Sequence, residues 1–313
     1  MKIVFLDAKT IGEDIDLSGF DALGEVVKYG FSTEQEARER SKDADVLILN
    51  KVQVNEQTIG EADHLKLVCV TATGTNNLDK EYLDKRGIAW RNVAGYSTES
   101  VAQHTFAMLF YLLEKLPYYD NYVKSEKYVN DVSFTHFAKA FHELSGMTYG
   151  IIGLGNIGRR VADIAKAFGC RVIYYSTSGR NSQPGYERVS FDELLEQSDI
   201  VSIHAPLDEN TLGLVNKEAF AKMKKSAILL NVGRGPIINE ADLAEALNNK
   251  TIAAAGLDVL SVEPMQEDNP LRGIKDSERL LITPHIAWAG VEARNRLMGI
   301  ILGQIKEFFK AHE

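Results

Sequence analysis

The sequence has few cysteines and lacks any long apolar run. Its 313 residues include only Cys69 and Cys170, which are too few for a disulfide framework and cannot form a zinc site alone. Both lie in apolar stretches, which predicts buried free thiols in a reducing, cytoplasmic setting. No run approaches the roughly 18 apolar residues of a membrane span, and acidic residues follow the amino terminus too closely for a signal peptide.

The chain also has fewer basic residues than acidic ones. The chain has 35 Lys and Arg against 44 Asp and Glu, which gives a formal net charge of −9. Binding to a phosphate backbone needs a positive surface, so nucleic-acid binding is not expected as the main task. With 45% hydrophobic and 25% charged residues, the composition is that of a globular protein of one large or two average domains.

Short apolar runs alternate with helix-prone stretches along most of the chain, which predicts α/β domains built on parallel sheets. A long apolar helix is expected over 101–113, a loop-rich aromatic arm over 118–145 and a final amphipathic helix over 290–311. We expect one domain from 1–100 with 290–313, and a second, over 101–289, inserted into it. The predicted strands are 2–6, 45–49, 67–70, 149–152, 171–175, 200–204, 227–232, 253–259 and 280–283.

The sharpest local motif is a glycine-rich turn, GLGNIG, between the predicted strand 149–152 and a predicted helix. Gly153 permits the tight turn, Gly155 allows a pyrophosphate to approach the backbone, and Gly158 allows close packing of helix and strand. The amino terminus of the helix offers free N–H groups and the positive end of its dipole to phosphates. A surface turn would explain the glycines alone, but their context favours a dinucleotide site.

The next strand end bears on which dinucleotide is bound. An NAD site usually has Asp or Glu there to accept from the ribose hydroxyls, but this strand ends in YYSTSGR. Ser176 occupies the expected position, and Thr177 and Arg180 follow. Hydroxyls and a guanidinium suit a 2′-phosphate, so the pattern favours NADP while leaving NAD open.

Three polar segments each follow a predicted strand, and the carboxyl ends of parallel strands share one edge of a sheet. They contain Arg234, Glu263 and His285. Arg234 would grip a carboxylate, His285 would give a proton to a carbonyl oxygen, and Glu263 would orient the imidazole. Each residue alone has a plainer explanation, as a surface cation, a turn residue or a packed histidine. Together, after a dinucleotide loop, they favour catalysis.

These residues lie in motifs that resemble those of a known protein family. GLGNIG, HAPLDENTLGLVN, NVGRG, GLDVLSVEP and TPHIAWA occur in the order found in the D-isomer-specific 2-hydroxyacid dehydrogenases, and the chain resembles that family over its full length. The resemblance implies a Rossmann-type dinucleotide-binding domain inserted into a flavodoxin-like substrate domain, an active site between the domains and a homodimer. Position by position, Arg234, Glu263 and His285 match the family's catalytic residues.

The resemblance also implies further contacts. Thr73 and Gly74, in ATGTNN, match the loop whose backbone N–H groups hold the substrate carboxylate, and Trp288 would cap a small pocket. ATGTNN with HIAWA is most similar to the glycerate dehydrogenase, or hydroxypyruvate reductase, branch, so hydroxypyruvate and glyoxylate are the favoured substrates. Cofactor contacts implied in the same way are Val101, Asn156, Ile157, His204, Ala205, Pro206, Val232, Gly233, Asp258 and His285.

Other functions remain open at this point. An NAD(H)-sensing corepressor-like protein would share the fold, and a related enzyme could use another keto acid such as pyruvate. A formate-type dehydrogenase is disfavoured because that branch has Gln where this chain has Glu263. The histidines form no metal-ligand spacing with acids or thiols, so no metal is expected.

Overall fold

A computed structural model describes residues 1–180, 183–276 and 278–311. The chain divides into two compact units. Unit 1 comprises Met1–Ser97 and Ala289–Glu313, and unit 2 comprises Thr98–Trp288. The sequence predicts boundaries after residues 100 and 289.

Unit 1 is built on a five-stranded parallel sheet with the order β2-β1-β3-β4-β5. This is the flavodoxin-like order. The second strand lies on one side of the first, and the later strands are added on its other side. The central strands β3 and β4 are buried throughout, as expected for parallel strands covered on both faces. The strands are β1 (Lys2–Phe5), β2 (Glu25–Lys28), β3 (Val46–Leu49), β4 (Leu67–Val70) and β5 (Ala89–Arg91).

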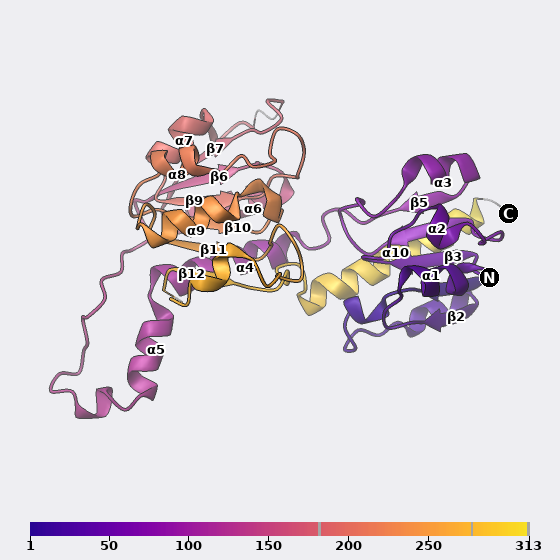
Figure 1. The fold of residues 1–313 in the computed structure, drawn as a ribbon, viewed down its shortest axis with the longest axis horizontal. Helices are drawn as coiled ribbons and strands as arrows, with labels where there is room; N and C mark the ends of the chain where they lie inside the picture. Colours follow the sequence, from indigo (N-terminus) through magenta and orange to yellow (C-terminus); the bar gives the residue numbers. More distant parts are fainter. Residues whose placement is uncertain (181–182, 277, 312–313) are drawn as a thin grey trace. The chain divides into compact units, whose positions relative to one another are not determined.

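Helices of unit 1 pack on this sheet (Figure 1). The helix α1 begins in a capping box, in which Thr33 and Glu36 each satisfy the other's backbone N–H. Ala37 of α1, Ile59 of α2 and Leu83 of α3 join one apolar cluster with residues of β1, β3 and β4. The helical elements are η1 (Ala8–Thr10), η2 (Ser18–Leu23), α1 (Glu34–Ser41), α2 (Glu56–Ile59), α3 (Lys80–Arg86) and α10 (Val291–Lys310).

Unit 2 contains a seven-stranded parallel sheet with the order β12-β11-β10-β9-β6-β7-β8. Numbered within the unit, this is the Rossmann order 3-2-1-4-5-6 with one strand added at the far edge. The fold prediction of two doubly wound parallel sheets is therefore confirmed. The strands are β6 (Thr148–Ile152), β7 (Arg171–Tyr175), β8 (Glu187–Arg188), β9 (Ile200–Ile203), β10 (Ile228–Asn231), β11 (Ala254–Leu257) and β12 (Leu280–Ile282).

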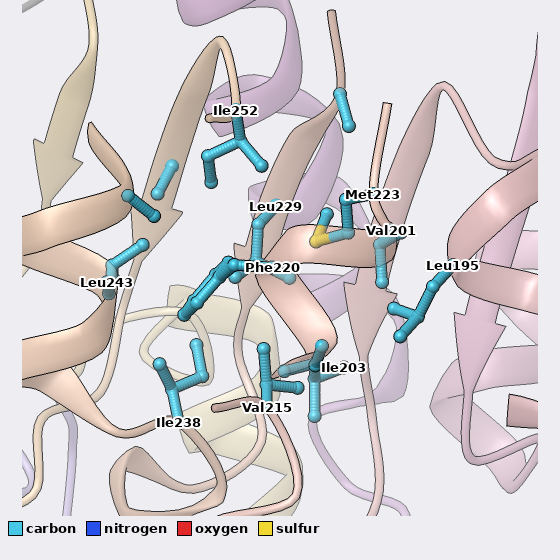
Figure 2. Close-up of a cluster of buried hydrophobic side chains, with 14 of the residues drawn as sticks. Leu195, Val201, Ile203, Val215, Phe220, Met223, Leu229, Ile238, Leu243 and Ile252 are labelled. Atoms are coloured by element: carbon cyan, nitrogen blue, oxygen red, sulfur yellow. The ribbon is translucent and has the colours of Figure 1, made fainter. Parts of the chain in front are cut away.

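Alternate side chains of these strands enter two separate cores. Tyr149 and Ile151 of β6 pack with α4 and α6, whereas Ile152 lies in the cluster on the opposite face, with α7, α8 and α9. Figure 2 shows that second cluster, centred on Phe220. The helical elements of unit 2 are α4 (Thr98–Leu113), α5 (Leu116–Lys124), η3 (Tyr128–Asn130), α6 (Asn156–Ala167), α7 (Phe191–Gln197), α8 (Lys217–Lys222), η4 (Gly235–Ile237), α9 (Glu240–Asn248) and η5 (Pro270–Gly273).

The segment expected to be a loop-rich arm differs from the prediction at its start. Its first part is the helix α5, which has a proline, Pro117, in its first turn. Proline is tolerated there because the N–H groups of that turn have no partner within the helix. In Figure 1, α5 and the segment after it run away from the rest of unit 2.

Two expectations from composition can be compared directly with the structure. Cys69 and Cys170 are both buried free thiols, as predicted. No helix in the described ranges is both long and apolar enough to cross a membrane.

Candidate active site

The glycine-rich turn lies between β6 and α6 and has the geometry of a dinucleotide loop. Gly153 has a left-handed backbone (φ 91°), and a Cβ there would come within 2.8 Å of the Ala205 backbone. A Cβ on Gly158 would collide with the carbonyl oxygen of Gly153, so only glycine allows this packing of helix and strand. A Cβ on Gly155 would meet open space.

The amino terminus of α6 is suited to a phosphate group. Its N-cap residue is Gly155, so no side chain caps the first turn. The free N–H groups and the positive end of the helix dipole therefore face the open space beside Gly155. Asn156 is exposed and Ile157 half-buried at this end of the helix. The residues present therefore fit the pyrophosphate of a dinucleotide.

Two side chains predicted to contact the cofactor hold buried polar atoms that need partners. Ser176 Oγ, just after β7, and His204 Nδ1, just after β9, form no hydrogen bond within the described ranges. The other ring nitrogen of His204 lies 2.9 Å from Ser202 Oγ. Burial lowers the pKa of His204 to about 3, so its ring is neutral at pH 7. Thr177 is half-buried and Arg180 exposed.

The Arg234 loop follows β10 and is shaped by a buried asparagine. Asn231, with 0% exposure, accepts from Gly233 N–H (3.0 Å) and donates from Nδ2 to the Arg234 carbonyl (2.9 Å). The Arg234 guanidinium donates to the Gly233 carbonyl at 2.8 Å. A Cβ at Gly235 would overlap the backbone of Leu260, so this loop packs directly on the loop that carries Glu263.

Glu263 and His285 come from the loops after β11 and β12 and are in direct contact. His285 Nδ1 lies 2.7 Å from Glu263 Oε2, and Glu263 Oε1 accepts from Leu260 N–H at 3.0 Å. The two side chains are 27% and 32% exposed. A carboxylate that accepts from Nδ1–H leaves the other ring nitrogen, Nε2, to face a reacting group.

Asp258 occupies a different place from the other acids. It is 2% exposed, and its carboxylate accepts from Ile286 N–H and Ala287 N–H, each at 2.9 Å, and from the Thr283 hydroxyl at 2.6 Å. It therefore holds the loop that carries His285. Its contact with the cofactor stays a prediction, as does that of Val101, which is buried in α4.

The other predicted substrate residues lie in different parts of the chain. Thr73 and Gly74 follow β4 in unit 1, where the Thr73 hydroxyl donates to the Val93 carbonyl (3.0 Å) and Asn92 Nδ2 donates to the Thr73 carbonyl (2.6 Å). Within the described part of the chain, the backbone N–H groups of Thr73 and Gly74 find no acceptor. Trp288 is half-buried at the end of unit 2.

Several structural residues of the site were not predicted. Asn231 and Thr283 are small polar residues. Their positions at strand ends were the sequence feature that could have indicated a role in the site. A third such residue is His104 of α4, whose Nε2 lies 3.0 Å from Thr283 Oγ1. Glu240 accepts from Ser261 N–H (2.6 Å) and Asn269 Nδ2 (2.7 Å), which supports the Glu263 loop from α9. No sequence pattern marks such contacts between loops.

A sheet in the Rossmann order, a glycine-rich turn and a helix with no side-chain cap together define unit 2 as a dinucleotide-binding domain. Residues 106–287 match the family model described as "D-isomer specific 2-hydroxyacid dehydrogenase, NAD binding domain". The match covers more than half of the chain. The protein belongs to the D-isomer-specific 2-hydroxyacid dehydrogenase family, as the resemblance predicted, and is therefore an oxidoreductase.

Similar proteins and a solved structure agree with this family assignment. The chain is 39% identical over 319 residues to a hydroxypyruvate reductase of Blautia hydrogenotrophica, covering 99% of this chain and 97% of that one. It is 33% identical over 308 residues to a glycerate dehydrogenase of Methylorubrum extorquens, with 98% and 96% coverage. A solved acyclic imino acid reductase in complex with NADPH and D-Arg matches at a TM-score of 0.87 and 28% identity, with 99% and 98% coverage.

Proposed function

We propose that this protein reduces a small 2-keto acid, with hydroxypyruvate or glyoxylate favoured, to the D-2-hydroxy acid. The observation that carries the proposal is the contact between Glu263 and His285, in loops beside that of Arg234. Similarity to a hydroxypyruvate reductase and a glycerate dehydrogenase supports this choice of substrate. A bound NAD(P)H supplies the hydride to the carbonyl carbon of the substrate.

The protonated ring of His285 is proposed as the general acid. Glu263 accepts from Nδ1–H, so Nε2 carries the proton that goes to the carbonyl oxygen as that oxygen gains negative charge. After the transfer, His285 is neutral and regains its proton from solvent, to which 27% of its side chain is exposed. In the oxidative direction the same nitrogen accepts the proton of the hydroxyl group.

Arg234 is proposed to bind the carboxylate of the substrate. A guanidinium can form two parallel hydrogen bonds to a carboxylate, which fixes its orientation as well as its position. The backbone N–H groups of Thr73 and Gly74 are further candidates for this anion, because they have no acceptor in the described ranges. Trp288 is proposed to limit the size of the group attached to the keto carbon.

The decisive experiment is a panel of 2-keto acids assayed with NADH and NADPH, in the wild type and in His285→Ala. We expect the highest kcat/KM with hydroxypyruvate or glyoxylate, and a loss of about 10²–10⁴-fold in the variant. His64→Ala, which changes an exposed histidine of unit 1, is the matched control. Unchanged turnover in His285→Ala would refute the general-acid role. Tight dinucleotide binding without turnover of any keto acid would favour the NAD(H)-sensing alternative.

NADP is the proposed cofactor, with NAD as the alternative. The small hydroxyls of Ser176 and Thr177 and the cation Arg180 follow β7, where an acid would disfavour a 2′-phosphate. Replacing Arg180 with methionine is expected to lower kcat/KM for NADPH roughly 10-fold, with little change for NADH. Lys225→Met, at another exposed cation of unit 2, is the control. An equal effect on both cofactors would contradict the preference.

We propose in addition that the protein is a homodimer and that the aromatic arm takes part in the contact. Val132, Phe134 and Phe137 are 103%, 89% and 87% exposed, which is unusual for a monomer. The family resemblance implies a second copy of this chain as the partner. A Phe134→Ser and Phe137→Ser double variant is expected to sediment as a monomer, while Phe31→Ser, at an exposed phenylalanine of unit 1, stays dimeric. A monomeric wild type would refute the proposal.

A further inference from the structure

A partly buried chain of polar side chains links α4 to the loop that carries His285. His104, with a side chain 20% exposed, lies with Nε2 3.0 Å from Thr283 Oγ1 and 3.6 Å from Asp258 Oδ1. The Thr283 hydroxyl has one proton, which it donates to Asp258 at 2.6 Å. It must therefore accept from His104, so His104 carries its proton on Nε2.

A second side chain of α4 reaches the other end of the same loop. The Ser100 hydroxyl donates to the Ala287 carbonyl at 2.6 Å. Ser100 and His104 are four residues apart, so they lie on one face of the helix. Together they contact the loop at Thr283 and Ala287, on either side of His285.

The backbone of His285 requires such support. Its φ is 54°, in the left-handed region, which is uncommon for any residue other than glycine, although histidine adopts it more often than most side chains do. Its N–H donates to the carbonyls of Asp258 (2.8 Å) and Thr283 (2.9 Å). Strained conformations of this kind persist when the surrounding contacts over-determine them, and they gather at functional sites.

We propose that His104 is a positioning residue for His285. By donating to Thr283, it fixes the hydroxyl that donates to Asp258, whose carboxylate in turn holds the next two N–H groups of the loop. Loss of this donor frees the Thr283 hydroxyl to rotate and loosens the loop. The inference deepens the proposed function, because it assigns a task in positioning the proposed general acid.

Kinetics provide the first test, with hydroxypyruvate and NAD(P)H as the probes. In His104→Leu and Thr283→Val we expect kcat to fall roughly 10–100-fold, while KM for hydroxypyruvate and the Kd of the dinucleotide change less than about 3-fold. The deuterium isotope effect with labelled NAD(P)H should rise as hydride transfer becomes slower. Thr283→Ser keeps the hydroxyl and should stay within about 3-fold of wild type. His142→Leu, at an exposed histidine of unit 2, is the control.

Hydrogen exchange provides a test that needs no turnover. A peptide spanning 283–288 should exchange at least about 10-fold faster in His104→Leu, and at the wild-type rate in Thr283→Ser. If the wild type reduces no 2-keto acid, the proposed function fails, and the exchange result alone supports or overturns the link from α4 to the loop. Faster exchange with unchanged kcat would show a merely structural role and overturn the proposal, as would no change in either. If His104→Leu does not fold, the Thr283→Val and Thr283→Ser pair decides.

Discussion

Both sheets use an aspartate that follows one strand to hold the loop after the neighbouring strand. In unit 1, Asp7 follows β1 and accepts from the N–H groups of Asn50, Lys51 and Val52, after β3. In unit 2, Asp258 follows β11 and accepts from the N–H groups after β12. Within the described residues, the Asp7 carboxylate accepts from backbone donors alone, and burial raises its pKa. Asp258 has in addition a hydroxyl and a neighbouring histidine, and the loop that it holds carries His285.

The amino ends of the two sheets are more alike. Asp45, before β3, accepts from Lys2 N–H at 2.7 Å, and Asp199, before β9, accepts from Thr148 N–H at 2.9 Å. Each half-buried aspartate satisfies the first donor of a neighbouring strand. We therefore expect the amino ends of both sheets to contribute to stability, and the carboxyl end of unit 2 to contribute to the proposed chemistry as well.

The largest effect is expected at Asp258. Changing it to alanine removes the acceptor of two backbone donors and one hydroxyl, so the loop that carries His285 is no longer held in position. We expect kcat/KM with hydroxypyruvate to fall about 100-fold or more, since a displacement of about 1 Å can cost that much. Steady-state kinetics measure the change, and Asp258→Asn, which keeps one acceptor oxygen, should lose less. A loss below about 3-fold in Asp258→Ala would remove the distinction between the two aspartates.

At Asp7 the expected effect is on stability. Asp7→Ala leaves three backbone N–H groups without their acceptor, at a cost of about 2 kcal/mol in the free energy of unfolding after relief of the buried charge. Urea denaturation of the variant measures it. Asp16→Ala is the control, because the exposed Asp16 carboxylate accepts only from Ser18 within the described ranges. Equal losses in the two variants would show that Asp7 has no special role.

A pH effect is expected in unit 2 through His204. Its pKa is about 3 in the folded protein against 6.5 for an ordinary histidine, so the unfolded chain binds the proton first. Stability is therefore lost as the pH falls from 6.5 toward 3, by about 2 kcal/mol at pH 5. Denaturation at pH 7.5 and pH 5 should show this loss in the wild type and in His64→Gln, but not in His204→Gln. A loss of the same size in His204→Gln would contradict the assignment.

The smallest effects are expected at the amino ends. Asp45→Ala and Asp199→Ala should each cost about 1 kcal/mol of stability, because each removes one hydrogen bond to a strand. Asp199 also lies 2.8 Å from Lys224 Nζ, a half-exposed ion pair that adds little. Neither variant should change kcat/KM. An effect on kcat above about 3-fold in either would show that these ends also influence the chemistry.

The sequence was informative wherever a strand is buried. The runs 46–49, 67–70, 149–152 and 200–203 are mostly apolar and buried throughout, and strands were predicted at all four. The edge strands β2, β5 and β8 were missed because they are short and partly exposed, so they lack both an apolar run and a clear alternation. The start of α5 was missed because a proline usually ends a helix, whereas Pro117 lies in the first turn of α5, where a proline is tolerated.

The site was predictable to a similar extent. Charged residues at strand ends are visible in sequence, and the structure brings Glu263 and His285 into contact at 2.7 Å. The supporting residues were not predictable as a set, because Asn231, Thr283 and His104 act through side-chain hydrogen bonds between segments far apart in the chain. Those bonds depend on how the loops pack, which no local pattern specifies.

The left-handed backbone at His285 bears on how any replacement there is interpreted. Alanine prefers a right-handed or extended backbone, so it removes the imidazole and also favours a rearranged main chain. Asparagine, like histidine, accepts this region more readily than most residues with a side chain, and it has no proton of suitable acidity to give. A paired measurement on His285→Asn and His285→Ala would therefore separate the chemical contribution of the ring from the shape of the peptide that presents it.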